Sequence, residues 1–387
     1  MILSICLITV SVTIISAAVK HSRHKNKAAS AESDSSVPQT GASEMSGISD
    51  GEISDDSPIL ISAESLAAES ESSATDTAAP NGSEVTVTIS AAGDCTLGTD
   101  ENFDPDTSFN AVFESRGYYE YFFENVLDTF SSDDLTIVNL EGTLTYSDYR
   151  EDKTFAFKGD PSFVNILTSG SIEACDLANN HSRDYGSESY TDTIQYVEDA
   201  GITTFGFDRS PVIEIKGVKV GLVGIYELAK DIECMDDLLE QINSVKELGA
   251  QLIITSFHWG DEGEHYPTST QIELAHAAID NGSDLVLGHH PHVLQGIETY
   301  KGKNIVYSMG NFCFGGNKNP SDKNSMIYRQ TFTVKNGVPA NDSNYSIIPC
   351  RLSSTSEYND YRPTVLYGEE GQEVLDNINT YSEGIYG

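Results

Sequence analysis

The stretch 283–292, Ser-Asp-Leu-Val-Leu-Gly-His-His-Pro-His, joins an apolar strand candidate directly to three histidines. Imidazole is the commonest protein ligand for borderline metals, and three imidazoles within four residues are rarely needed for packing. Gly288 and Pro291 shape the turn, so that His290 and His292 can converge on one point. We interpret this turn as part of a metal site. A polar surface turn that merely contains histidines is the alternative, and ligand-type residues after other strands argue against it.

Residues that can bind metals or transfer protons follow other strand candidates in the same way. Several apolar or alternating runs predict strands and end in Gly-Asp, Asn-Leu-Glu, Asn-Asn-His or His-Trp-Gly. These runs are 85–91, 135–138, 172–178 and 251–256, and the residues that follow them include Asp94, Glu141, Asn180, His181 and His258. Helix-period positions in 238–248 and 268–279 lie between strands. Alternating strands and helices predict an α/β fold whose strand carboxyl ends carry the site.

Two hairpins add antiparallel strands to this pattern. One pairs 212–215 with 218–225, and the other pairs 296–300 with 304–308, each around a Lys-Gly turn. After Met326 the sequence predicts two further strands and a short amphipathic helix around 374–381. The hairpins imply a mixed sheet.

The chain divides by composition into three parts. Residues 1–19 are almost wholly apolar or small and would reach about 28 Å as a helix, close to the thickness of a bilayer core. They predict a transmembrane anchor or signal segment. Residues 20–84 are rich in Ser, Ala, Glu and Asp and cannot bury enough apolar surface to offset their ordering entropy, so they predict a disordered acidic tether. Residues 85–387 form one large domain, with the motifs in 85–352.

Charge and cysteine content limit the partners. The basic flank from Lys20 to Lys27 follows the apolar run, which by the positive-inside rule alone would place the globular part in the cytoplasm. A long acidic stalk suits a domain held off a surface, so we expect a single-pass cell-membrane protein with an extracytoplasmic globular domain. The net charge of -38 disfavours binding to nucleic acid. The cysteines are widely spaced without a Cys-x-x-Cys motif, which predicts packed, reduced thiols.

The strand-end residues share one chemistry, because all are hard or borderline metal ligands. They are Asp94, Glu141, Asn180, His181, His258, His290 and His292. Each alone has an ordinary explanation as a helix cap, a turn residue or a core histidine. Together they indicate a hydrolytic metal centre. Two cations about 3.5 to 4 Å apart can activate a water and hold both oxygens of a phosphoryl displacement.

Six short motifs, in order, resemble those of the bacterial CapA-type capsule synthesis proteins. They are Gly93-Asp94, Asn139-Leu140-Glu141, the run 177–181 with Asp184-Tyr185-Gly186, His258-Trp259-Gly260, the run 288–293 and the run 307–312. That family is associated with poly-γ-glutamate capsule production and has a calcineurin-like metallophosphoesterase fold. The resemblance covers about 85–314 and implies a four-layer α/β/β/α sandwich, membrane anchorage and an outward-facing domain.

The resemblance also implies a role for each motif residue. The metal ligands would be Asp94, Glu141, Asn180, His258, His290 and His292, and the cofactor would be one or two divalent metal ions, with Mn, Zn and Fe all suited to these donors. His181 would be the general acid. Asp184 would orient it, with a simple turn role as an equal alternative. His289 belongs either to substrate binding or to a supporting position behind the ligands, and Arg183, with Lys153 and Lys158, is a candidate for gripping an anionic substrate.

Two departures from these patterns bear on two functional hypotheses. Thr96 stands where the phosphoesterase superfamily usually has a histidine, and Thr99 and Gly263 replace an Arg and a Tyr that are common in the CapA-type family. The first hypothesis is a metal-dependent hydrolase that acts at the cell surface on a phosphoester or on an anionic polymer. The second is a noncatalytic anchor subunit of a capsule polymer synthase or export complex, whose subunits would be its partners.

Overall fold

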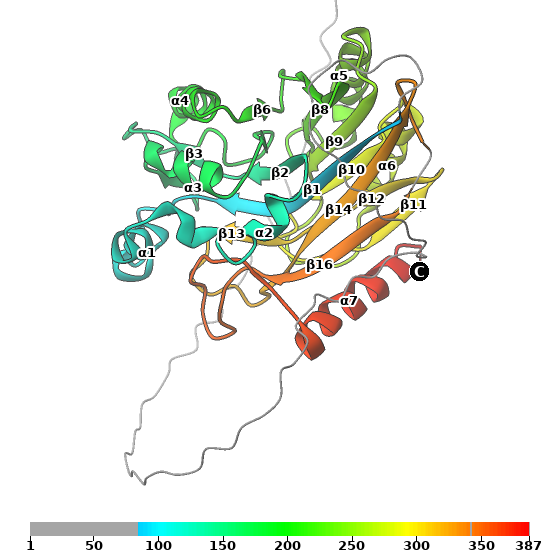
Figure 1. Cartoon of the computed structure of the whole chain (residues 1–387). Helices are drawn as coiled ribbons and strands as arrows, with labels where there is room; N and C mark the ends of the chain where they lie inside the picture. Colours follow the sequence, from blue (N-terminus) through cyan, green and yellow to red (C-terminus); the bar gives the residue numbers. More distant parts are fainter. Residues whose placement is uncertain (1–83, 341–342, 387) are drawn as a thin grey trace, which may run out of the picture. The chain divides into compact units, whose positions relative to one another are not determined.

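The computed structural model describes residues 84–340 and 343–386 (Figure 1). The predicted anchor, 1–19, and the tether up to residue 83 lie outside the described residues. Among the helices of the described ranges, none is long and apolar enough to cross a membrane.

The first sheet is mixed and has the strand order β17-β16-β14-β1-β2-β5-β6. Its parallel half contains β1 (Glu84–Thr96), β2 (Leu135–Leu140), β5 (Ala174–Asp176) and β6 (Thr203–Phe205). Its antiparallel half contains β14 (Asn324–Lys335), β16 (Tyr345–Arg351) and β17 (Thr364–Val365). Two short strands join off this path, since β13 (Asn311–Phe314) pairs in parallel with the end of β1, and β15 (Val338–Pro339) pairs with β14.

The second sheet has the order β11-β12-β10-β9-β8-β7. Its four inner strands are parallel: β8 (Val218–Tyr226), β9 (Leu252–His258), β10 (Leu285–His289) and β12 (Lys303–Val306). The edge strands β7 (Val212–Ile215) and β11 (Ile297–Tyr300) pair antiparallel with β8 and β12, so both predicted hairpins are confirmed. A separate ribbon pairs β3 (Thr143–Leu144) with β4 (Lys158–Gly159).

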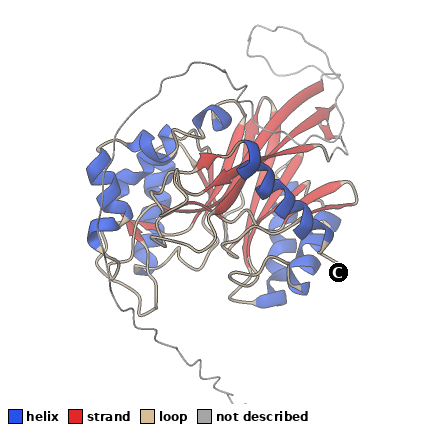
Figure 2. Cartoon of the chain, turned by 90° about the horizontal axis from the view of Figure 1, so that it is seen from below, coloured by secondary structure: helices blue, strands red, loops and turns tan. Residues whose placement is uncertain are grey.

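Helices cover the outer faces of both sheets. The α-helices are α1 (Phe109–Arg116), α2 (Leu127–Phe130), α3 (Val164–Ser169), α4 (Gly186–Asp199), α5 (Met235–Glu247), α6 (Ser269–Asp280) and α7 (Gly368–Glu383), and the 3-10 helices are η1 (Pro105–Thr107), η2 (Tyr119–Phe122), η3 (Pro161–Phe163) and η4 (Asp231–Cys234). Figure 2 shows helices on opposite sides of the strands. The α/β class is therefore confirmed, as are the helices predicted around 238–248, 268–279 and 374–381.

Strand alternation sorts the apolar residues into three cores. In β9, Leu252 and Ile254 point into the core between the sheets, whereas Ile253 and Phe257 point outward onto α5 and α6. A third core joins the outer face of the first sheet to the helices α1, α3 and α4. Helix α7 contacts β16 of the first sheet and the edge strand β11 of the second, and it adds its apolar residues to the core between the sheets, so it covers that core along one edge (Figure 1).

The strands that carry the motifs differ in length from the prediction. The predicted strand 85–91 continues to Thr96, because β13 extends the ladder and pairs Asn311 with Asp94. Asp94 therefore lies within a strand and not after it. The predicted strand 172–178 is shorter, with only Ala174–Asp176 in the sheet. The five cysteines of the described residues are buried free thiols, as expected, and Cys6 lies outside them.

Candidate metal centre

The carboxyl ends of strands from both sheets meet at one place. The first sheet brings Asp94 on β1, Glu141 directly after β2 and Asn180 after β5. The second sheet brings His258 at the end of β9, and the turn after β10 brings His290 and His292. Each of the six predicted ligands therefore lies at this edge. The first sheet supplies oxygen donors and the second supplies imidazoles.

Glu141 occupies the middle of this arrangement. Its side chain is fully buried, and neither carboxylate oxygen has a hydrogen-bond partner among the described residues. Three imidazoles face the same oxygen: Oε1 lies 3.8 Å from Nε2 of His181, 3.8 Å from Nε2 of His258 and 3.9 Å from Nε2 of His292. Ligand atoms of Glu141, His290 and His292 also lie within 4.8 Å of one another.

Asp94 is also fully buried, but unlike Glu141 it has polar partners at both carboxylate oxygens. Its Oδ1 accepts a hydrogen bond from Nδ2 of Asn139 at 2.8 Å and lies 3.3 Å from Nδ1 of His289. Its Oδ2 lies 3.2 Å from Nδ1 of His292 and accepts the backbone N–H of His290 at 3.3 Å. One carboxylate of the first sheet therefore contacts all three histidines of the turn.

A contact between Asn180 and His258 also joins the two sheets. Oδ1 of Asn180 lies 2.8 Å from Nε2 of His258. Nδ2 of Asn139 lies 3.3 Å from Nδ1 of the same histidine, and Oδ1 of Asn139 accepts from Nδ2 of Asn179 at 2.9 Å. Asn139 belongs to one of the sequence motifs, but the motif alone predicted no role for it. The structure shows that it links Asp94, His258 and Asn179.

Burial perturbs the acids of the centre in opposite directions. Burial raises the pKa of Glu141 to about 8, despite the attraction of His292. Burial also acts on Asp94, but the contacts with His289 and His292 outweigh it and hold the pKa of Asp94 well below its ordinary value. Only one of the two carboxyls is therefore firmly ionised when no cation is present.

The pKa values of the imidazoles also shift in opposite directions. Burial holds the pKa of His258 well below its ordinary value and lowers the pKa of His290 to about 4. Burial also opposes the charged form of His292, but the nearby Glu141 and Asp94 raise its pKa to about 10. His258 and His290 are thus neutral at pH 7 with a lone pair available, while His292 carries a proton that a cation would replace.

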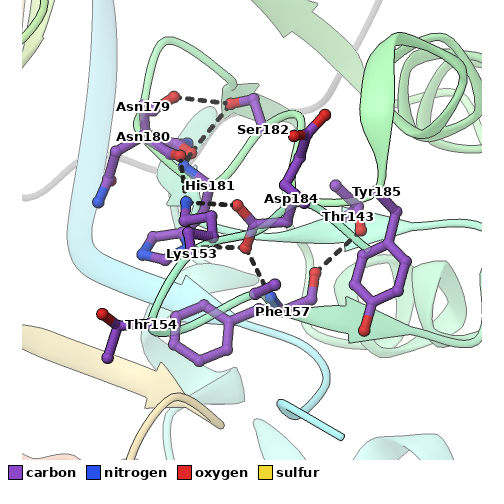
Figure 3. Close-up of polar contacts among 12 residues, drawn as sticks. Thr143, Lys153, Thr154, Phe157, Asn179, Asn180, His181, Ser182, Asp184 and Tyr185 are labelled. Carbon is purple, nitrogen blue, oxygen red and sulfur yellow. Dashed lines mark hydrogen bonds and ion pairs between the residues drawn. The ribbon is translucent and has the colours of Figure 1, made fainter. Parts of the chain in front are cut away.

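The predicted acid His181 belongs to a polar network shown in Figure 3. Nδ1 of His181 lies 2.6 Å from Oδ2 of Asp184, which leaves Nε2 facing Glu141. The Asp184 carboxylate also accepts the N–H of Phe157 and the ammonium of Lys153, each at 2.6 Å. Lys153 further donates to the carbonyl of Asn180 at 2.9 Å. Burial lowers the pKa of His181 despite this pairing.

Two residues expected to contact substrate are placed elsewhere. His289 is 1% exposed and lies behind Asp94, a position that fits the supporting alternative and not direct contact with substrate. Arg183 is exposed, and its guanidinium lies over the rings of Tyr190 at 4.8 Å and Phe207 at 5.2 Å. Lys153 and Lys158 are each paired with a carboxylate, Asp184 and Asp148 respectively.

The backbone explains the glycines and the histidine turn. A Cβ on Gly93 would lie 1.9 Å from the carbonyl oxygen of Gly310, and one on Gly288 would lie 2.0 Å from that of Tyr307. These positions require glycine because two backbone segments approach each other closely there. For Gly288 this reason differs from the sharp turn that was predicted from the sequence. The strained residues are His290 and His292, with φ of 95° and 58°. Backbone strain of this kind is characteristic of functional sites.

These residues fit a divalent metal ion. A buried carboxylate without a hydrogen-bond partner is costly unless a cation neutralises it, and Glu141 meets this description. Nδ1 of His290 is likewise buried without a partner among the described residues. Carboxylate, amide and imidazole donors suit Zn, Mn and Fe alike. Thr96, two residues after Asp94, is buried, and its hydroxyl has no hydrogen-bond partner within 84–340 and 343–386, so the position of the usual histidine holds no strong ligand.

Comparison with known proteins agrees with the motifs. Residues 88–316, more than half of the chain, match the family described as "Bacterial capsule synthesis protein PGA_cap". This range contains all of the residues that form the centre.

Three curated proteins are similar to about half of the chain. The capsule biosynthesis protein CapA of Bacillus anthracis is 30% identical over 221 residues, which cover 50% of this chain and 54% of that protein. The PGA biosynthesis protein CapA of Bacillus subtilis is 28% identical over 224 residues, 52% of this chain and 59% of that protein. A probable polyglutamine synthesis accessory protein of Mycobacterium tuberculosis is 28% identical over 256 residues, 57% and 66%. The chain thus spans little more than half the length of the two CapA relatives and, on the strength of the family match, belongs to the bacterial capsule synthesis protein PGA_cap family.

Proposed function

We propose that this chain is a membrane-anchored protein of capsule poly-γ-glutamate biosynthesis whose globular part carries a metal-dependent, phosphoesterase-like site. Family membership and the names of the two CapA relatives support the capsule role. One observation carries the metal-dependent site: the buried carboxylate of Glu141 has no hydrogen-bond partner in the described part of the chain and is faced by Nε2 atoms of three histidines. The two facing sheets with outer helices support a metallophosphoesterase-like sandwich.

The chemistry would be hydrolysis of a phosphoester. When bound, divalent metal ions supply Lewis acidity toward phosphoryl oxygens and a water of lowered pKa. Asp94, Glu141, Asn180, His258, His290 and His292 would hold one or two such ions. Asp94, Glu141, His258 and His290 are buried, whereas Asn180 and His292 are partly exposed. Burial strengthens the electrostatic contacts of the first four residues.

His181 would supply the proton for the departing oxygen. Its Nδ1–H donates to Asp184 at 2.6 Å, so an imidazolium would carry its second proton on Nε2, the atom that faces the centre. Transfer of that proton to the departing oxygen leaves neutral His181 with its Nδ1–H still on Asp184. Lys153 holds Asp184 from the other side and so fixes the ring orientation.

The second candidate is a noncatalytic anchor subunit of a capsule polymer synthase or export complex, in which the metal would stabilise structure. Thr96 favours this alternative, because a buried threonine hydroxyl replaces an imidazole ligand next to Asp94. Both candidates place residues 1–19 in the cell membrane and the globular part outside it.

Metal analysis followed by activity measurements tests the proposal. The full-length chain should retain at least one divalent ion per molecule and hydrolyse members of a phosphoester panel, with γ-glutamyl oligomers assayed in parallel. His181→Ala should abolish turnover while retaining the metal. His276→Ala is the control, because His276 pairs with Glu298 away from the centre. Absence of bound metal, or full activity of His181→Ala on each hydrolysed substrate, would refute the enzymatic proposal.

A complementation experiment separates the two candidates. If the chain acts as an enzyme, His181→Ala should fail to restore capsule output in a strain that lacks the protein. If it is an anchor subunit, His181→Ala should restore output fully, whereas removal of residues 1–84 should abolish it.

A further inference from the structure

Four phenylalanines form a continuous aromatic row that begins at the metal centre. Phe157 lies 4.4 Å from the ring of His181, and Phe314 lies 5.1 Å from the ring of His292. The two phenylalanines are 6.4 Å apart and almost fully buried. Figure 3 shows Phe157 next to His181. The inner end of the row therefore forms one wall beside the general acid.

The outer end of the row reaches the surface. Phe103 and Phe155 lie 6.3 and 6.4 Å from Phe157 and 6.0 Å from each other. Phe155 is 49% exposed, although an aromatic ring is normally buried when it serves only the core. Both rings line a cavity of about 430 Å³, together with Asn102, Thr107, Asn317 and Lys318. This volume is within the range of small-molecule sites.

The polar part of the cavity wall narrows the kind of ligand. The hydroxyl of Thr107 is buried and has no hydrogen-bond partner among the described residues. Asn102 and Asn317 contribute amide groups, and at the rim Lys318 lies 3.7 Å from the carboxylate of Asp104. A ligand must therefore combine an apolar face for the rings with groups at its edge that donate and accept hydrogen bonds.

Charge and hydrogen bonding exclude two other ligand classes. The cavity that adjoins this one along η1 is lined by Asp100, Glu101, Asp106 and Glu114, so the surroundings repel a polyanion. A fatty chain would match the phenylalanines but would leave the Thr107 hydroxyl without a partner, at a cost. The amides of Asn102 and Asn317 already bond to the Asp100 carboxylate and to the backbone N–H of Asn319, and each can make further hydrogen bonds. A sugar ring presents C–H groups on its face and hydroxyls around its edge, and it satisfies both parts of the wall.

We propose that this groove, formed by Phe103, Phe155 and the polar residues beside Thr107, binds an uncharged sugar ring. The aromatic row connects the groove to the His181 side of the centre, so the ring would belong to the departing alcohol of the phosphoester. That last assignment rests on the proposed function, whereas the binding of the sugar itself does not.

Direct binding to the full-length protein tests the proposal. The probe is methyl N-acetyl-β-glucosaminide, followed by saturation-transfer NMR and calorimetry, with adenosine and a γ-glutamyl pentamer as probes of other classes. Native protein should bind the saccharide in preference to both. Phe155→Ala and Thr107→Val should each weaken saccharide binding at least about fivefold, because they remove the stacking face and the buried hydroxyl respectively. Thr107→Val keeps the side-chain shape and guards against a folding defect.

Two further variants keep the outcomes distinct. Tyr146→Ala removes an exposed ring from the same connection between β3 and β4, away from the groove, and should leave saccharide binding unchanged. Glu141→Gln should lose metal and retain the saccharide. No saccharide binding by a native protein that holds metal and hydrolyses phosphoesters overturns this inference alone, as does preference for adenosine or the pentamer. Saccharide binding that depends on Phe155 in a protein without metal or hydrolysis overturns only the proposed function.

Discussion

The two sheets contribute unlike halves of the metal centre. The first sheet contributes oxygen donors, with Asp94 on β1, Glu141 directly after β2 and Asn180 in the turn after β5, and Asn139 links Asp94 to Asn179. The second contributes imidazoles, two of which lie in a turn with strained backbone. The oxygen half contains the group most in need of a cation, Glu141, while the imidazole half contains the donors on strained backbone, His290 and His292. Each half is therefore incomplete without the other, and the centre forms only when the sheets pack together.

The largest effect should follow from neutralising the oxygen half. Glu141→Gln removes the charge that a metal ion would neutralise, so metal affinity should fall by more than about 100-fold. The metal-free protein should become more stable, by at most about 3 kcal/mol at pH 7, because the folded state no longer contains a carboxyl whose pKa is raised to about 8. Competitive chelation and denaturant unfolding measure the two quantities.

Glu227→Gln is the matched control for this prediction. Glu227 is a buried carboxyl outside the centre that accepts the N–H of Gly260 at 3.3 Å. Its substitution should leave metal content unchanged. Unaltered metal affinity in Glu141→Gln would contradict the central position assigned to this carboxylate.

The imidazole half should show a graded response. His292 faces Glu141 through Nε2, so His292→Ala should lower metal affinity by more than about 100-fold. His289 only contacts Asp94, and His289→Ala should cost about 10-fold to 100-fold, as expected for a residue that supports a ligand. Isothermal titration with Mn and Zn ranks the two variants. Equal losses would show that the two histidines play the same part.

Breaking the link within the oxygen half should have a smaller effect. Asn139→Leu keeps the size of the side chain but removes one of the partners of Asp94 Oδ1 and one of the partners of Asn179 Nδ2. We expect a loss of unfolding free energy of about 1 to 3 kcal/mol and of metal affinity of about 10-fold. Asn165→Leu, at an exposed position on α3, should change neither quantity appreciably. Native stability of Asn139→Leu would count against this link.

The pH dependence of stability tests a further buried carboxyl of the first sheet. Burial raises the pKa of Asp176, at the end of β5, to about 6, so ionising it in the folded protein costs stability. That cost is absent below the ordinary carboxyl pKa, grows between about pH 4 and 6 and is complete above pH 6. Asp176→Asn should therefore equal the native chain in stability at pH 4 and exceed it at pH 8, by at most about 3 kcal/mol. Thermal unfolding across this range measures the difference, and a constant difference would contradict the assignment.

Local sequence patterns were sufficient for much of the fold. The Lys-Gly turns predicted both hairpins, and the apolar periodicity predicted α5, α6 and α7 because these elements form from neighbouring residues. The pairing of Asn311 with Asp94 joins residues more than 200 positions apart. No local pattern contains that information, and for this reason the prediction ended β1 too early.

The sequence alone determined which residues could bind a metal, since residue type and position after a strand are properties of the chain itself. Packing of the two sheets decided how those residues divide into roles. It buried Glu141 without a hydrogen-bond partner among the described residues and placed His289 behind Asp94. It also directed Arg183 onto two aromatic rings. Asn139 became a link between the halves, because it contacts both Asp94 and His258. The physical reason is that burial, charge and hydrogen bonding depend on neighbours from distant segments, and only the folded protein brings those neighbours together.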